Sequence, residues 1–522
     1  MNSLLKRPKN SWLFALAASL SACSDAEKNT PAWPYGVRYE VFVLSFADGN
    51  GDGKGDIRGL TSRIDYLEDL GVNGVWLMPI MNSPSYHKYD VTDYKSIHPD
   101  YGTIEDFKVF VKTAHSKNIR VIVDLVINHT SNLHPWFQEA SSAKTNPYRD
   151  YYVWAKKDSI RSQISKKTTS FDSDNITQWH AVNGDTTSEH YYGFFWGGMP
   201  DLNFDTEQVM REIVDIGKFW LEEMDVDGFR LDAAAHIFPG DRAADNHKFW
   251  NRFRAEMQKI KPDVYLVGEV WLGAKEVAPY LNGLPSLFNF DMAAAITTVV
   301  TAGLDTVGLI NKYKEITDFY TTVNPNYLDA TFLSNHDQNR ILSQLDDNIQ
   351  KMRIAAGILF TLPGTPYVYY GEEIGMKGVK PDEYIREPFI WAESNTDAMQ
   401  TSWEQPKYSN DQTVQPLSKQ KEDVGSLYNF YKEMIWLRNG SKILTMGAIE
   451  KTNFSIAEVV SFRRIYENEE LLVLNNISDV EITIPFRDEN EKFDEVFYDS
   501  NKTSVFEDGE LTLPAYSTVI LK

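Results

Sequence analysis

The sequence predicts an α/β protein with eight parallel strands closed into a barrel, a lobe inserted after strand 3 and a C-terminal antiparallel β-sandwich. Three observations predict this fold. From about residue 35 to 435, apolar runs without alternation, typical of parallel strands buried on both faces, alternate with helix-like segments. These runs number eight, as in a (β/α)₈ or TIM barrel. After about residue 440 the runs become short, β-rich and bounded by turn residues.

The eight runs set the expected domain boundaries. The predicted strands are 39–46, 74–79, 120–127, 228–232, 265–270, 286–290, 330–334 and 367–370. Between the third and fourth strands, residues 130–204 are too numerous for an ordinary βα loop, so we expect them to form the inserted lobe. The barrel then comprises 35–129 and 205–440, and the sandwich comprises 443–522.

The N-terminus has the pattern of a secretory signal over residues 1–22. Basic residues precede an apolar stretch that is too short to span a bilayer, and the stretch ends at Leu20-Ser21-Ala22-Cys23. This segment resembles the bacterial lipoprotein signal, which implies a lipid on Cys23 and a tether over 23–34. The resemblance predicts an exported, membrane-anchored lipoprotein at the outer membrane, its periplasmic face or the cell surface. Because Cys23 is the only cysteine, disulfides within the chain are excluded.

Composition restricts the partners. A net charge of −22 argues against nucleic acid, whose binding depends on Lys and Arg that neutralise phosphates. Aromatic residues make up 13% of the chain, which suits stacking on sugars but equally suits a large core. We expect a monomer.

Four carboxylates stand at the ends of predicted strands. They are Asp124 in VIVDLVINH, Asp232 in GFRLDAAAH, Glu269 in VYLVGEVW and Asp337 in FLSNHDQNR. In a (β/α)₈ barrel the C-terminal strand ends meet at one face, so these acids could converge. Paired carboxylates at one site are what glycosidic bond cleavage requires. Ion pairs that cap barrel strands would explain any one of these acids, but not the set.

Those four segments, in order, resemble the α-amylase family of glycoside hydrolases. The resemblance covers nearly the whole mature chain and implies that Asp232 is the nucleophile, Glu269 the general acid/base and Asp337 the third carboxylate, which stabilises the transition state. Asp124 is implied to support the site. The segment MPDLN at 199–203 resembles a group intermediate between oligo-1,6-glucosidases and neopullulanases.

The resemblance also implies residues around the bound sugar. Arg230 lies two residues before Asp232 on the same strand face, where it should keep that carboxylate ionised. Apolar neighbours of Glu269 favour its protonated form. Structural roles, as packed barrel residues, are the alternative for the aromatic and histidine positions. The implied substrate-binding residues are Tyr89, His129, Arg230, His336 and Arg386.

A second motif, DGNGDGKGD at 48–56, indicates a calcium site. Oxygen ligands at alternate positions, with glycines between them, suit a hard cation. The loop is not an EF-hand, because Gly59 stands where the bidentate Glu is required. It resembles the calcium loop after the first barrel strand of the same family; a solvated turn is the alternative. The implied ligands are Asp48, Asn50, Asp52, the carbonyl of Lys54, and Asp56.

The function implied is endo-cleavage of α-1,4-glucosidic bonds in starch, glycogen and maltooligosaccharides, with retention through a glycosyl-enzyme. Ala233, after the nucleophile, resembles α-1,4-acting members. Ala235 stands where many α-amylases carry lysine, which leaves product length open. The alternatives on the same fold are an α-glucosidase, a maltogenic amylase or a 4-α-glucanotransferase. The remote alternative is a non-catalytic glycan-binding or scaffold protein.

Overall fold

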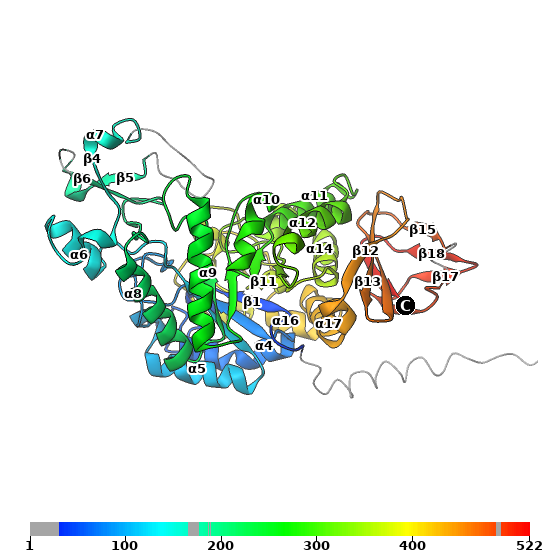
Figure 1. Ribbon diagram of the computed structural model, residues 1–522. Coiled ribbons are helices and arrows are strands. Elements are labelled where there is room, and N and C mark those ends of the chain that lie inside the picture. The colour runs from blue at the N-terminus through cyan, green and yellow to red at the C-terminus, as the bar shows by residue number, and fades with distance from the viewer. Residues whose placement is uncertain (1–30, 165–176, 186, 188, 487–491) are drawn as a thin grey trace, which may run out of the picture.

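The computed structural model describes residues 31–164, 177–185, 187, 189–486 and 492–522 (Figure 1). The predicted signal peptide, Cys23 and the tether as far as residue 30 lie outside the described residues. No described helix is both long and apolar enough to cross a membrane.

Eight parallel strands form the predicted barrel. Their order in the sheet is β10-β9-β8-β7-β3-β2-β1-β11. The sheet closes where Phe332 bridges Tyr367 and the Tyr367 N–H donates to the carbonyl of Thr331 at 2.8 Å. The fold class is therefore confirmed. In chain order the strands are β1 (Arg38–Val41), β2 (Gly74–Leu77), β3 (Arg120–Leu125), β7 (Gly228–Leu231), β8 (Tyr265–Gly268), β9 (Ser286–Phe288), β10 (Leu328–Ala330) and β11 (Tyr367–Tyr369).

Two strand predictions are wrong in extent. The run 39–46 is a strand only as far as Val41, and a helical turn, α2 (Val43–Phe46), follows it. A short apolar run does not distinguish a buried strand from a buried helix. The seventh strand is Leu328–Ala330 rather than 330–334, because the chain leaves the ladder with β9 after Ala330. Asp337 therefore lies in a loop beyond the strand.

Helices cover the outside of the barrel. Each buries an apolar stripe, as in α8, which buries Val209, Ile213 and Ile216 at helical spacing. Helix α5 begins with a capping box between Thr103 and Asp106. The principal helices are α3 (Ile57–Ser62), α4 (Ile64–Leu70), α5 (Ile104–Ser116), α8 (Glu207–Lys218), α9 (Ala243–Ile260), α11 (Phe290–Ala302), α12 (Leu309–Val323), α14 (Ile349–Thr361) and α17 (Leu427–Gly440).

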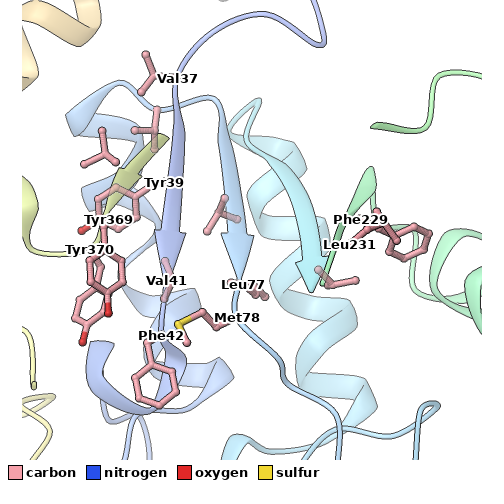
Figure 2. Packing of buried hydrophobic residues seen from close by; sticks show 14 of the residues in the cluster. Val37, Tyr39, Val41, Phe42, Leu77, Met78, Phe229, Leu231, Tyr369 and Tyr370 are labelled. Carbon is pink, nitrogen blue, oxygen red and sulfur yellow. The ribbon is translucent and has the colours of Figure 1, made fainter. Parts of the chain in front are cut away.

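The barrel has an inner and an outer apolar layer. The rings of Trp76 on β2 and Phe288 on β9 lie 5.3 Å apart although these strands are not neighbours, so their contact crosses the barrel interior. The outer layer packs between strands and helices. Figure 2 shows part of it, with Tyr39, Tyr369 and Tyr370 grouped on one side of β1. The strands are thus buried on both faces, which explains their continuous apolar sequence.

Two further units lie at opposite ends of the barrel in Figure 1. The lobe contains α6 (Pro135–Ser142) and a sheet ordered β4-β6-β5, with strands Trp154–Lys156, Glu189–Tyr192 and Trp179–Ala181. The C-terminal unit has two antiparallel sheets that share an apolar core, as a sandwich requires. Its five-stranded sheet is β12 (Ala448–Lys451), β13 (Val459–Tyr466), β14 (Glu469–Asn476), β19 (Ser517–Leu521) and β16 (Val496–Asp499); the other is β15 (Ile482–Pro485), β18 (Glu510–Leu513) and β17 (Val505–Glu507).

Candidate active site

Arg230, fully buried near the end of β7, connects three carboxylates. Its Nη1 lies 3.1 Å from Oδ1 of Asp124 and 2.5 Å from Oδ1 of Asp232, and its Nη2 lies 2.8 Å from Oε2 of Glu269. β3, β7 and β8 are adjacent, and Asp124 pairs in register with Arg230. Alternation along each strand turns these side chains inward. The structure therefore brings the predicted nucleophile and general acid to one guanidinium.

The surroundings of Glu269 differ from the expectation that apolar neighbours favour its protonated form. Trp271 stacks on Phe290 at a centroid distance of 4.5 Å. The Glu269 carboxylate instead receives the Arg230 guanidinium and the Ala233 N–H, the latter at 3.2 Å. The carboxylate of Glu269 therefore contacts one guanidinium and one backbone N–H.

The predicted third acid lies beside two cations. Nη2 of Arg386 is 2.9 Å from Oδ1 of Asp337, and Nε2 of His336 is 3.2 Å from Oδ2. Burial alone would raise the pKa of Asp337, but His336, Arg386 and Arg230 hold it well below its usual range. Asp337 is therefore an anion, and its side chain is one-third exposed, so it can face a ligand.

Tyr89 connects this group to Asp124. Its ring lies parallel to that of His336, with centroids 5.5 Å apart, and its hydroxyl is 2.6 Å from His336 Nε2 and 3.1 Å from Asp124 Oδ2. His129 places Nε2 3.1 Å from the carbonyl oxygen of Tyr89, and burial lowers the pKa of this histidine. All eight residues predicted for catalysis and substrate binding are thus joined in one network.

Asp124 lies at the bottom of the site. Burial raises the pKa of Asp124 to about 7, although Arg230 opposes this change. The Trp76 indole and the Tyr89 hydroxyl both donate to its Oδ2. These contacts fix Asp124, which shares the Arg230 guanidinium with Asp232, so Asp124 is placed to hold the arginine in position.

The sequence reasoning missed two acids. Glu40 on β1 is 2% exposed, and its Oε1 is 2.5 Å from Nδ1 of His336. Its signal was the one charged residue in the apolar run YEVFVLSF, residues 39–46. Asp201, in the segment MPDLN, is also buried. Its backbone forms an antiparallel β-bridge with that of His129, which joins the lobe to the end of β3. Burial raises the pKa of Asp201 to about 7.

A pocket of about 740 Å³ opens between the lobe and the barrel loops beside this network. The lobe contributes Trp179 and Tyr192, whereas His236 and Leu272 come from the loops that follow Asp232 and Glu269. The pocket has aromatic walls and several polar groups, the usual lining of a small-molecule site. Neither Asp232 nor Glu269 lines this pocket, which lies at the loops that follow them.

The predicted calcium loop lies apart from the acids and packs against residues 399–402. Asp48 accepts N–H groups from Asn50, Gly51 and Gly53, while Asp56 caps helix α3 through Gly59 N–H at 2.7 Å. Within the described part of the chain, no three His, Cys, Asp or Glu side chains gather closely enough to hold a metal.

The donor set of this loop nevertheless fits a hard cation. All of its candidate ligands are oxygens, and those of Asp48 and Asp56 are buried. Burial and the nearby Asp48 raise the pKa of Asp56, a cost that a cation would reduce. The Lys54 ammonium turns away from the loop to Asp100, at 2.8 Å.

Comparison with known proteins gives consistent matches. Residues 40–447 match the family model described as alpha amylase, catalytic domain, and residues 459–520 match the alpha-amylase SusG C-terminal domain. Alpha-amylase 3 of Dictyoglomus thermophilum is 42% identical over 494 residues, covering 95% of this chain and 94% of the relative.

Two further relatives extend these matches. A 4-alpha-glucanotransferase of Thermotoga neapolitana is 35% identical over 450 residues, covering 85% of this chain and 96% of the relative. A crystal structure of an alpha-amylase from H. orenii superposes with a TM-score of 0.85 at 44% identity, covering 93% of this chain and 99% of that one.

Proposed function

We propose the function of this chain from one premise: it belongs to the α-amylase family of glycoside hydrolases. The proposed activity is endo-cleavage of α-1,4-glucosidic bonds in starch, glycogen and maltooligosaccharides. The observation that carries it is the pair of Asp232 and Glu269, which reach one guanidinium from adjacent strands. The α-amylase relatives and Ala233 after the nucleophile support α-1,4 bonds.

The proposed reaction has two steps. An Asp232 oxygen attacks the anomeric carbon as the bond to the leaving oxygen breaks, and Glu269 donates a proton to that oxygen. In the second step Glu269 takes a proton from water, which attacks the same carbon and releases Asp232. Arg230 donates a hydrogen bond to Asp232 and so positions its carboxylate for the attack. Asp337, held as an anion by His336 and Arg386, stabilises the positive charge that develops on the sugar.

The product profile tests this proposal. A chain that begins at Ser24 should convert soluble starch to mixed maltooligosaccharides early in the reaction, with rapid loss of iodine staining. Chromatography of a time course on starch and maltoheptaose measures it. Release of glucose alone would replace the proposal with an α-glucosidase. No product from either substrate would favour a glycan-binding protein.

A second candidate function is 4-α-glucanotransfer. The relative from Thermotoga neapolitana bears that name, and the pocket at the loops that follow Asp232 and Glu269 could hold part of a sugar acceptor. The same time course separates the two functions, because a transferase makes products longer than maltoheptaose. Both functions use the same pair of acids.

We further propose Ca²⁺ at the loop 48–56, bound by Asp48, Asn50, Asp52, the carbonyl of Lys54, and Asp56. At a free Ca²⁺ concentration 100 times Kd, bound metal adds about 2.7 kcal/mol to the free energy of unfolding. Chelation with EGTA should therefore lower Tm by roughly 5 °C. Calorimetry with and without EGTA measures this change.

Two variants sharpen the calcium test. Asp52→Ala should have the lower Tm and no longer respond to the chelator, whereas Asp318→Ala, an exposed position on α12, should respond as the parent chain does. If chelation leaves the Tm of the parent chain unchanged, and Asp52→Ala has the same Tm as the parent, the loop does not bind Ca²⁺ and is an ordinary solvated turn.

Export and lipid anchoring on Cys23 are proposed from the N-terminal pattern. A Cys23→Ser chain expressed in a bacterium should move from the detergent phase to the aqueous phase in Triton X-114 partition. Equal partition of both chains would contradict the anchor.

A further inference from the structure

His336 lies between two carboxylates, one at each ring nitrogen. Nδ1 is 2.5 Å from Oε1 of Glu40, and Nε2 is 3.2 Å from Oδ2 of Asp337. His336 is fully buried and Glu40 is 2% exposed, so little water screens the contact between them. A histidine that donates to a carboxylate from each ring nitrogen carries a proton on both nitrogens.

The other groups around this ring fit the doubly protonated form. The Tyr89 hydroxyl is 2.6 Å from Nε2 and 3.1 Å from Asp124 Oδ2, so it accepts from the histidine and donates to the aspartate. The Trp76 ring meets the His336 ring edge-on. The Nε of Arg386 donates to the His336 backbone carbonyl at 2.9 Å.

We propose that Glu40 is a positioning residue that holds His336 as an imidazolium and thereby keeps Asp337 ionised toward the substrate. Glu40 makes no substrate contact in this scheme and acts through His336. Glu40 lies on β1, 296 residues before His336, which lies in the loop after β10. A residue of the first barrel strand thus sets the charge of a histidine on that loop. Only the kinetic part of this inference rests on the proposed function.

The electrostatics of the histidine agree with this geometry. Burial alone would lower the pKa of His336, yet the carboxylates of Asp337 and Glu40 raise it to about 10. Stabilisation from the extra proton is therefore complete below the ordinary histidine pKa and is lost as pH rises toward 10. Without the Glu40 charge, that loss should begin at a lower pH.

Glu40→Gln removes the charge and keeps an amide that can donate to Nδ1, so a neutral His336 with its proton on Nε2 is well accommodated. NMR of chains labelled with ¹⁵N in the histidine rings measures the protonation state directly, with the His336 signal assigned by its absence in His336→Asn. At pH 8 the parent chain should show an imidazolium. In Glu40→Gln the titration midpoint should fall by about 3 pH units.

Kinetics supply the second readout. The ratio of kcat for Glu40→Gln to kcat for the parent should fall about tenfold between pH 5.5 and pH 8, because His336 remains protonated at the lower pH in both chains. Using the ratio cancels the pH effects that both chains share. Glu40→Asp, which restores the charge, should recover much of the activity at pH 8. Glu373→Gln, an equally buried glutamate bonded to Tyr39 and Tyr66, is the matched control and should give a flat ratio.

A neutral His336 in the parent chain at pH 8 would overturn the inference, and this result requires neither a variant nor activity. A pH-independent ratio for Glu40→Gln would also overturn it. If instead the imidazolium is present but starch and maltoheptaose give no product, the proposed function fails while the role of Glu40 stands.

Discussion

Replacing Asp232 with asparagine should lower kcat on maltoheptaose by about 10⁴-fold or more, because an amide cannot attack the anomeric carbon. The change keeps the shape of the side chain, and the Arg230 guanidinium can still donate to the amide oxygen, so the fold should survive. Steady-state kinetics together with circular dichroism measure both. Asp318→Asn on α12 is the matched control and should keep full activity. A folded Asp232→Asn chain that retains a tenth of the parent kcat would show that Asp232 is not the nucleophile.

Two substrates with different leaving groups distinguish the role of Glu269 from that of Asp232. Glu269→Gln should lower kcat on maltoheptaose by about 10²–10⁴-fold, since the leaving oxygen then departs without a proton. α-Maltosyl fluoride releases fluoride, which needs no protonation, so formation of the glycosyl-enzyme should survive in this variant. Asp232→Asn should be inactive on both substrates. Equal loss on both substrates in Glu269→Gln would argue against a role as general acid.

Replacing Arg230 with methionine should lower the free energy of unfolding by about 3–5 kcal/mol at pH 8, because buried carboxylates lose their cation. Asp124 and Asp232 are both less than a tenth exposed and both contact Arg230. The pKa of Asp124 is already about 7 with the arginine present and should rise further without it. A pKa raised by folding gives stability at low pH that is lost as pH rises, so the defect should be smaller at pH 5.

Urea denaturation at pH 5 and pH 8 measures this effect. Arg438→Met is the matched control, since the Arg438 guanidinium is equally buried but donates to the backbone carbonyls of Phe360, Leu362 and Gly364. It should also destabilise the chain, but by amounts that do not grow from pH 5 to pH 8. If the loss of stability in Arg230→Met is the same at both pH values, the Arg230 guanidinium does not compensate the negative charge of Asp124 and Asp232.

The strands and the acids could be predicted because both depend on local pattern. Six of the eight predicted strands begin where the structure begins them, as with β3 at Arg120 and β8 at Tyr265. Asp232 and Glu269 directly follow buried strands, and parallel packing then brings them together. The extent of β1 and β10 could not be predicted, since α2 and the loop after Ala330 are as apolar as a strand.

Glu40 could not be predicted for another reason. Its significance depends on His336, which becomes its neighbour only when the barrel closes. In the sequence it is one charge in an apolar run, which is equally consistent with a strand end or an exposed edge. Likewise, Arg230 contacts Glu269 from the neighbouring strand, so the apolar residues next to Glu269 in the sequence indicated a different environment from the observed one.

The most direct test is to trap the glycosyl-enzyme. Glu269→Gln should react with α-maltosyl fluoride: the bond from C1 to fluorine breaks, a bond from C1 to an Asp232 oxygen forms, and fluoride leaves. Water then lacks its general base, so the ester should accumulate. Mass spectrometry should find one added maltosyl group on the peptide that contains Asp232. An adduct on another residue, or no adduct together with a product of inverted anomeric configuration, would contradict retention through Asp232.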